Sequence, residues 1–164
     1  MTLPAPAFEH KIVGAEALAQ RAAQLPRPIV FTNGVFDLLH RGHVTYLARA
    51  RALGASLIVA INADASVRRL GKGTDRPLNT EADRAAIIAA LESVSLVTIF
   101  EDSVPLAPLQ TVRPEVYVKG GDYNMTEIPE AQCARGWGAQ TLAIAFEHER
   151  STTALLARIR GSQA

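Results

Sequence analysis

The alternation of apolar runs with amphipathic stretches predicts an α/β fold for this chain. We expect a Rossmann-like, doubly wound, mostly parallel sheet of five strands with helices on both faces. Residues 57–61 form a continuous apolar run, which is typical of a strand covered on both sides. Residues 44–53 instead carry apolar side chains at helical spacing, and Gly54 marks the end of that helix.

In the first half of the chain, prolines and a capping threonine mark further element ends. Pro26 and Pro28 end the first expected helix, and the apolar run that follows is the first strand. Thr80 begins a later helix, since its hydroxyl oxygen can accept a hydrogen bond from the first turn. In order, we expect helix 14–25, strand 29–31, helix 44–53, strand 57–61, helix 65–70 and helix 80–91.

The second half of the chain continues the alternation. We expect a strand over 94–100, a helix over 104–112, a strand over 116–119, a helix over 130–137, a strand over 140–144 and a helix over 152–160. A chain of 164 residues suits a single sizeable core.

Composition and charge exclude several classes of protein. Apolar residues make up 48% and charged residues 20%, as in ordinary globular proteins. The net charge of +1 offers no basic field for nucleic acid. No apolar run approaches the roughly 20 residues that cross a bilayer, and the N-terminus lacks the pattern of a secretory signal. Cys133 is the single cysteine, so we expect no internal disulfide and a cytoplasmic location.

The most informative stretch runs from residue 31 to 43, where the first strand turns into a helix. It contains His40 and His43 with Gly42 between them. The first N–H groups of a helix lack intrahelical acceptors, and together with the helix dipole they favour an anion. Imidazoles beside them can donate to phosphate oxygens and stabilise charge that develops there. The stretch therefore predicts phosphoryl or nucleotidyl transfer.

Each part of this stretch also has a simpler interpretation. A single histidine near a helix start is more often a cap or a surface residue, and two histidines could form half of a zinc site. With four histidines and one cysteine in the chain, no metal-binding set completes such a site, so we expect no metal held by protein side chains alone. Gly34 and Gly42 could simply relieve tight turns. The strand, the two histidines, the glycines and the helix in one stretch indicate a functional site more strongly than any of them alone.

Other polar residues follow the expected strands at their carboxyl ends. In a mostly parallel sheet these ends share one edge, where ligands bind. We therefore expect one cleft that collects the segment 32–43, Asn62 and Asp64, the segment 119–122, and Ser151, Thr152 and Thr153.

Five strings of this chain resemble the cytidylyltransferase-like nucleotidyltransferases, which are marked by His-x-Gly-His. Within this superfamily the chain resembles the D-glycero-β-D-manno-heptose 1-phosphate adenylyltransferases of lipopolysaccharide core synthesis. The resemblance covers nearly the whole chain from about Lys11 onward, and it implies a helical extension over 1–27 followed by a nucleotidyltransferase domain over 28–164. The strings are 31–43, 62–67, 76–79, 118–123 and 151–155.

Two positions depart from the family pattern. Val35 stands where relatives often have cysteine, and residues 148–150 replace a turn that commonly contains glycine. Many relatives are fused to a sugar kinase, so this chain is expected to be a stand-alone version or an excised domain.

The resemblance implies that ATP and the heptose 1-phosphate react to give ADP-heptose and pyrophosphate. A sugar phosphate oxygen would attack the α-phosphorus in line, without a covalent enzyme intermediate. It also implies Mg²⁺ that arrives with ATP, ATP and heptose 1-phosphate as small-molecule partners, and a homodimer or higher homo-oligomer, with neither nucleic acid nor a membrane as a partner.

The resemblance implies roles for individual residues. The catalytic group is His40, His43 and Lys72. The nucleotide and phosphate group is Thr32, Asn33, Gly34, Phe36, Gly42, Lys119, Gly120, Ser151, Thr152 and Thr153. The sugar-phosphate group is Asp37, Asn62, Asp64, Arg76 and Asp122.

Several of these roles have alternatives of equal or greater weight. Asp37 could cap a turn, Phe36 could pack into the core, and Lys72 and Arg76 could be exposed loop residues. The serine and threonines at 151–153 could be a plain helix cap. Outside the site, Arg84 is expected to pair with Glu81 on its own helix, and Tyr46 and Trp137 are expected in the core or at an interface.

Two other functions compete with this assignment. One is another member of the same superfamily, such as a glycerol 3-phosphate cytidylyltransferase, since the sequence specifies the phosphate machinery better than the base or the acceptor. The other is a non-catalytic nucleotide-binding module. His40 and His43, both present, argue against the second.

Overall fold

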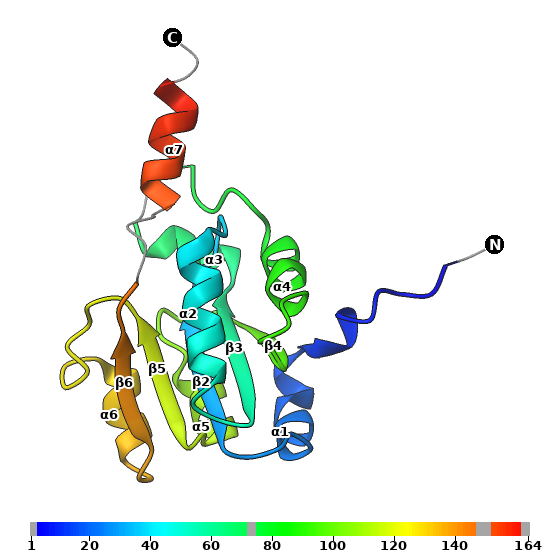
Figure 1. The fold of residues 1–164 in the computed structure, drawn as a ribbon, viewed down its shortest axis with the longest axis vertical. Coiled ribbons are helices and arrows are strands. Elements are labelled where there is room, and N and C mark those ends of the chain that lie inside the picture. The colour runs from blue at the N-terminus through cyan, green and yellow to red at the C-terminus, as the bar shows by residue number, and fades with distance from the viewer. Residues whose placement is uncertain (1–2, 72–74, 147–151, 162–164) are drawn as a thin grey trace.

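A computed structural model describes residues 3–71, 75–146 and 152–161 of the chain (Figure 1). It contains a sheet of six strands in the order β1-β4-β3-β2-β5-β6, and all the strand pairs are parallel. The α/β doubly wound prediction is confirmed, but the strand count of five is wrong. The sixth strand is β1, Ile12–Val13, which pairs with β4 at the sheet edge. A strand of two residues is too short to show the hydrophobic periodicity by which strands are recognised in a sequence.

The remaining elements lie close to their expected positions. The strands are β2 (Ile29–Gly34), β3 (Ser56–Asn62), β4 (Leu96–Phe100), β5 (Val116–Gly120) and β6 (Gln140–Ile144). The helices are a 3₁₀ turn (Glu9–Lys11), α1 (Ala15–Ala23), α2 (Arg41–Arg51), α3 (Asp64–Arg69), α4 (Glu81–Ala89), α5 (Leu106–Val112), α6 (Pro129–Arg135) and α7 (Thr152–Gly161).

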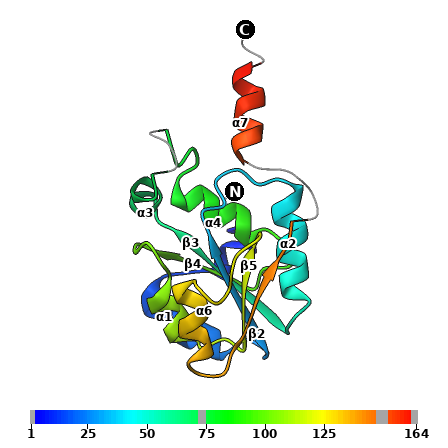
Figure 2. The same cartoon turned by 90° about the vertical axis from the view of Figure 1, so that its left-hand side faces the viewer.

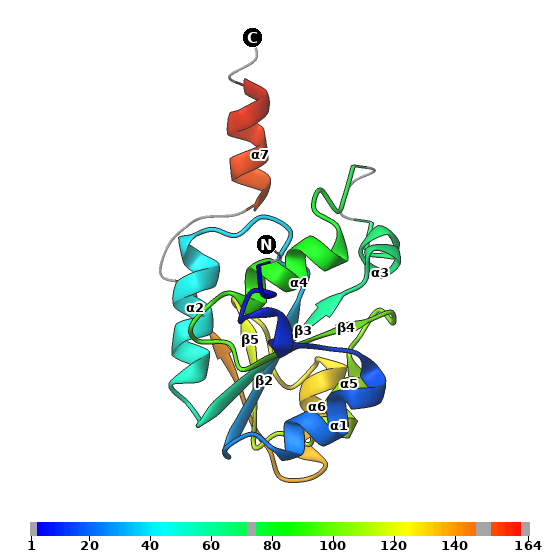
Figure 3. The same cartoon turned by 90° about the vertical axis from the view of Figure 1, so that its right-hand side faces the viewer.

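Helices cover both faces of the sheet, as Figures 2 and 3 show: α2 and α4 lie on one face, and α1, α5 and α6 on the other. Each face has its own hydrophobic cluster. Leu47 of α2 and Ile88 of α4 belong to the first, and Leu18 of α1 and Leu109 of α5 to the second. Because β3 lies between both layers, all its residues are buried, which explains its unbroken apolar run.

The segment before residue 28 takes part in this core. It supplies β1 to the sheet and Leu18 and Ala22 of α1 to one hydrophobic cluster. The division of the chain at residue 28 stays a prediction.

Two helix starts bear on the site. The hydroxyl of Thr80 accepts a hydrogen bond from the Asp83 N–H, so its predicted role as the cap of α4 is confirmed. Helix α2 begins at Arg41 rather than near residue 44, with His40 as its N-cap residue. Both histidines of the motif therefore lie at the start of the helix, where its unpaired N–H groups are.

Helix α7 extends beyond the edge of the sheet at which the strands end, away from both helical layers (Figure 1). Among the helices that the structure describes, none has the length and apolar character needed to cross a bilayer.

The strand order also locates the site. Helix α2, which follows β2, covers one face, and α6, which follows the neighbouring strand β5, covers the other (Figures 2 and 3). The strand order thus proceeds in opposite directions from β2 and from β5, although the two strands are parallel. In doubly wound folds the ligand crevice opens at the carboxyl ends of such a pair.

Candidate functional site

A cleft of about 340 Å³ opens at the carboxyl ends of β2 and β5. Seven of the predicted site residues line it, and so do seven that the sequence did not single out as site residues. The predicted ones are Asn33, Gly34, Phe36, His43, Asn62, Lys119 and Gly120. The others are Val35, Tyr46, Leu70, Ser103, Tyr123, Glu130 and Phe146.

The two histidines stack on each other at the start of α2. Their ring centroids are 3.9 Å apart and their planes are 24° from parallel. The rings of Phe36 and Phe146 meet His43 edge-on, with centroids at 5.4 and 6.1 Å. His43 lines the cleft and His40 lies directly against it, so the aromatic rings hold the pair in a defined orientation beside the helix start.

Burial and the neighbouring His40 lower the pKa of His43 to about 4. Burial has the larger effect, because it penalises the charged imidazolium, and a second positive charge on the stacked ring would add repulsion. At neutral pH His43 is therefore uncharged, although a hydrogen bond with the Leu38 backbone favours the protonated ring and partly offsets the lowering of its pKa. A phosphate placed against the ring would favour the protonated form and reverse the shift.

This pKa predicts an acid-sensitive step in folding stability. The folded pKa lies below the unfolded value of about 6.5, so the unfolded chain binds the proton more tightly. The contribution of His43 to the free energy of unfolding is fully present above pH 6.5 and decreases as the pH is lowered. At pH 4 about 3 kcal/mol of it is lost. Urea unfolding of wild type and His43→Gln at pH 7 and pH 4 measures the difference.

The exposed His10 provides the matched control. His10→Gln is expected to lose as much stability on acidification as the wild type, whereas His43→Gln loses about 3 kcal/mol less. Equal losses in all three proteins would show that His43 titrates normally in the folded state.

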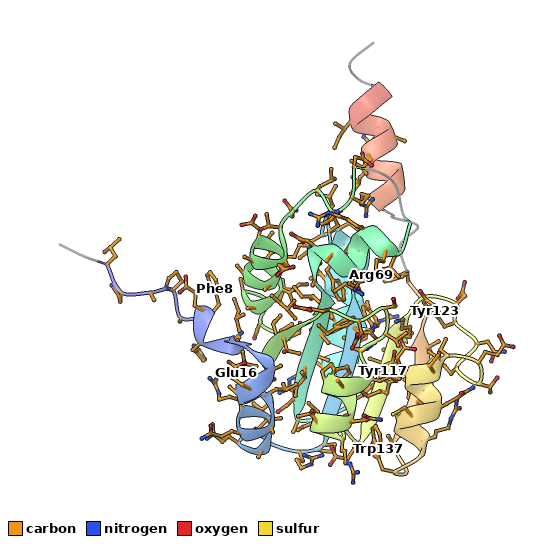
Figure 4. All side chains as sticks on the ribbon, turned by 180° about the vertical axis from the view of Figure 1, so that it is seen from behind. Phe8, Glu16, Arg69, Tyr117, Tyr123 and Trp137 are labelled. Atoms are coloured by element: carbon orange, nitrogen blue, oxygen red, sulfur yellow. The ribbon has the colours of Figure 1, made fainter. Side chains whose placement is uncertain are left out.

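A polar cluster forms the floor of the cleft between β2 and β5. Asn33 Oδ1 accepts hydrogen bonds from the Tyr117 hydroxyl at 2.8 Å and from Lys119 Nζ at 3.2 Å. Lys119 Nζ also lies 3.4 Å from Oε1 of Glu130, which belongs to the first turn of α6. Tyr123 follows in the loop after β5 (Figure 4), and Lys119 Nζ lies 5.5 Å from the centre of its ring.

Tyr46, which lines the cleft, and the buried Thr32 join three elements. Their hydroxyls are hydrogen bonded to each other, and the Tyr46 hydroxyl donates to the Val118 carbonyl at 3.4 Å. Burial raises the pKa of Tyr46, which stays protonated. The Thr32 side chain is fully buried, and this bond holds α2 against β2 and β5.

Two residues predicted to bind the sugar phosphate, Asp37 and Arg76, pair with each other. Arg76 Nε lies 2.7 Å from Asp37 Oδ2, and the Asp37 side chain is fully buried. The same carboxylate accepts the N–H groups of Leu78 and Asn79, each at 2.9 Å. Asp37 therefore anchors the distant 76–79 loop rather than a turn of its own segment.

Arg84 is a buried cation that joins three segments near the cleft. It donates to the carbonyls of Val35 and Asn62, both at 2.7 Å, and to that of Asn79 at 3.1 Å. Its ion pair is with Asp64 at 2.8 Å, so the expected pairing with Glu81 is wrong. The Glu81 carboxylate instead accepts the Asp64 N–H at 2.6 Å. Arg84 thus ties together the ends of β2 and β3 and the start of α4.

With this geometry in view, the comparisons with known proteins are decisive. Residues 31–155 match the family model described as cytidylyltransferase-like. The chain belongs to the cytidylyltransferase-like family. It is 58% identical over 155 residues to the D-beta-D-heptose 1-phosphate adenylyltransferase of Bordetella bronchiseptica, with 93% of this chain and 96% of the relative covered.

This cytidylyltransferase-like chain also resembles part of a longer protein and nearly all of a shorter one. It is 44% identical over 158 residues to the bifunctional protein HldE of Geotalea uraniireducens, covering 94% of this chain and 32% of that protein. A crystal structure of the lipopolysaccharide core biosynthesis protein from Thermoplasma volcanium superposes with a TM-score of 0.60 at 26% identity, covering 74% of this chain and 98% of the other.

The cytidylyltransferase-like fold brings some predicted residues to the cleft and uses others elsewhere. Asn62 lines the cleft, but its amide donates to Ser66 Oγ at 2.9 Å. Gly42 is buried in the first turn of α2. Asp122 is exposed and is not among the residues that line the cleft. Lys72 and Ser151 lie outside the described residues, as do the side chains of Thr152 and Thr153.

The aromatic residues divide between the cleft and the core. Phe36 belongs to both, because it is 7% exposed and part of a hydrophobic cluster, and it also lines the cleft. Its φ of 50° lies in the left-handed region, which is costly for a residue with a side chain. Trp137 lies at the opposite end of the sheet, where its indole donates to the Pro114 carbonyl (Figure 4).

Glu130 is the most consequential residue that sequence reasoning missed. It is a carboxylate only 5% exposed, yet its sequence neighbourhood indicates only a short helix. Its one available signal is its position in the first turn after the loop that follows β5.

Proposed function

We propose that this protein is an adenylyltransferase that converts ATP and D-glycero-β-D-manno-heptose 1-phosphate to ADP-heptose and pyrophosphate, for lipopolysaccharide core synthesis. The observation that supports this proposal most strongly is the position of His43. A neutral imidazole, stacked on a second one, lines a cleft at the start of α2 and at the reversal point of the sheet. The 58% identity to a heptose 1-phosphate adenylyltransferase supports the choice of nucleotide and acceptor.

In this reaction an oxygen of the sugar phosphate forms a bond to the α-phosphorus of ATP. The bond from that phosphorus to the bridging oxygen breaks, and the electron pair leaves with pyrophosphate. Such a displacement needs positioning and charge stabilisation rather than a protein nucleophile. His43 and His40 stabilise the negative charge on the α-phosphate and on the departing bridging oxygen, together with the N–H groups that begin α2.

Mg²⁺ would arrive bound to the phosphates of ATP. Within the part of the chain that the structure describes, no three His, Cys, Asp or Glu side chains are grouped so that they could hold a cation. The residues at hand therefore suit a cation that phosphate oxygens ligate, and Mg²⁺ would supply charge neutralisation there.

We also propose a homodimer or higher homo-oligomer and a cytoplasmic location. On α4 the side chains of Ala85, Ile88 and Ala89 are buried in the core, whereas Ile87 is 43% exposed and available to a partner subunit. A cytoplasmic location agrees with the use of ATP and with a single cysteine.

The decisive experiment measures pyrophosphate release by the purified protein with ATP or CTP against a panel of phosphorylated acceptors. We expect the highest kcat/KM with ATP and the heptose 1-phosphate. Higher kcat/KM with CTP and glycerol 3-phosphate would replace this substrate assignment by that of the competing cytidylyltransferase. Nucleotide binding without release from any pair would favour the non-catalytic module.

A further inference from the structure

The proposed reaction employs the α2 side of the cleft and leaves its α6 side without a role. On that side Glu130 projects from the first turn of α6, and it is buried although it carries a carboxylate. A buried carboxylate is costly unless it is paired, so its presence in a ligand cleft calls for a partner. Lys119 supplies one, at 3.4 Å from Oε1.

Glu130, Asn33 and Lys119 form a cluster that still has hydrogen-bonding groups for a ligand. Glu130 Oε1 lies 3.4 Å from Lys119 Nζ, and a carboxylate with its four lone-pair sites can accept further hydrogen bonds besides that one. Asn33 Oδ1 already accepts from Tyr117 and Lys119, so the Asn33 carboxamide is oriented with its NH₂ group as the remaining donor. The cleft therefore presents an acceptor, a donor and a cation within one small cluster.

This combination suits hydroxyl groups better than phosphate. A hydroxyl can donate to Glu130 and at the same time accept from Asn33 or Lys119. A phosphate would be repelled by the carboxylate. The ring of Tyr123, 46% exposed and lining the same cleft, adds an apolar surface for the C–H groups of a sugar. The cluster is thus built for a polyol.

In-line geometry indicates which polyol lies there. The attacking oxygen and the leaving pyrophosphate must lie on opposite sides of the α-phosphorus. If His40 and His43 stabilise the leaving side, next to α2, the acceptor lies across the cleft, next to α6. Helices α2 and α6 cover opposite faces of the sheet (Figures 2 and 3), so this separation follows from the fold.

We propose that Glu130, together with Asn33 and Lys119, binds hydroxyl groups of the acceptor sugar and is the residue that selects a sugar phosphate with those hydroxyls. This inference rests on the proposed function, because it names the acceptor of that reaction. The Glu130 carboxylate accepts from the sugar, and its Oε1 keeps Lys119 in place.

The test compares Glu130→Gln with wild type in steady-state kinetics, varying heptose 1-phosphate and ATP separately. We expect the KM for the sugar phosphate to rise about tenfold to hundredfold, as for the loss of a charge-assisted hydrogen bond, while the KM for ATP and kcat stay within about threefold. Glu127→Gln, the same change on an exposed side chain in the preceding loop, is expected to behave as wild type.

A set of monodeoxy heptose 1-phosphates gives a second readout, which a merely structural role would not produce. The analogue that lacks the hydroxyl bound by Glu130 should bind less well to wild type but suffer no further loss in Glu130→Gln. If urea titrations show that Glu130→Gln is not folded, Glu130→Asp tests the same point. Aspartate keeps the negative charge, but its side chain is one methylene shorter and moves the carboxylate away from the sugar.

The outcomes separate the two proposals. Equal rises in both KM values, or additive losses with every analogue, would overturn the role of Glu130 in sugar binding. A fall in kcat alone would mean that Glu130 only positions Lys119. Wild-type protein that does not turn over heptose 1-phosphate would overturn the proposed function itself, and this inference with it.

Discussion

His43→Ala is expected to lower kcat by about 10²–10³-fold, while the Kd for ATP changes by less than about tenfold. The physical reason is that negative charge on the α-phosphate and bridging oxygens grows as the reaction proceeds. A donor aimed at those oxygens therefore stabilises the transition state more than bound ATP. Single-turnover rates give the loss in the chemical step, and calorimetric titration with a non-hydrolysable ATP analogue gives the binding.

The stacked geometry adds a second expectation for this experiment. Because the His40 and His43 rings are 3.9 Å apart, removing one changes the packing and electrostatics of the other. The double variant should therefore lose less activity than the product of the two single losses. His10→Ala, on an exposed residue, should retain wild-type kinetics. Equal losses in kcat and in ATP affinity after His43→Ala would contradict the transition-state role.

Arg84→Met is expected to cost about 3–5 kcal/mol of the free energy of unfolding. The Arg84 side chain is 0% exposed, so its loss leaves the Asp64 carboxylate and three carbonyl groups without their donor. Methionine replaces the aliphatic part of the arginine side chain but not its guanidinium group, so the loss combines the missing polar contacts with the space that this group leaves. Urea unfolding at pH 7 provides the measurement.

Arg68→Met is the matched control, since Arg68 is an exposed arginine on α3. It is expected to change stability by less than about 0.5 kcal/mol. Arg84→Lys keeps the charge but not the fork of donors, and should fall between the two. If Arg84→Met were as stable as wild type, the junction between β2, β3 and α4 would not depend on this residue.

Local patterns in the sequence were sufficient for most of the fold. The apolar run of β3 and the Thr80 cap of α4 depend on side chains within a few positions of one another, and both are found as predicted. Strand β1 was missed because its two residues are defined only by their pairing with β4, far along the chain.

The candidate site divides in the same way. The histidines of the motif were located correctly at the start of α2, because a strand-to-helix junction can be recognised locally. Arg84 was assigned the wrong partner, since helical spacing considers only the same helix, whereas its partner Asp64 lies before that helix. Sequence alone also did not distinguish Asp37 from a carboxylate that faces the ligand. The Asp37 carboxylate instead pairs with Arg76 and accepts a hydrogen bond from the Leu78 N–H in the 76–79 loop.

By itself, the sequence determined the alternation of strands and helices and located the two histidines at the junction of β2 and α2, where it predicts phosphate binding. These features follow from periodicity and from neighbouring residues. Only the tertiary structure decided that His43 is uncharged at neutral pH and which carboxylates remain for a ligand. Burial and ion pairing join residues from distant segments, as Glu130 and Lys119 show, so the chain must be folded before a side chain's charge and partners are defined.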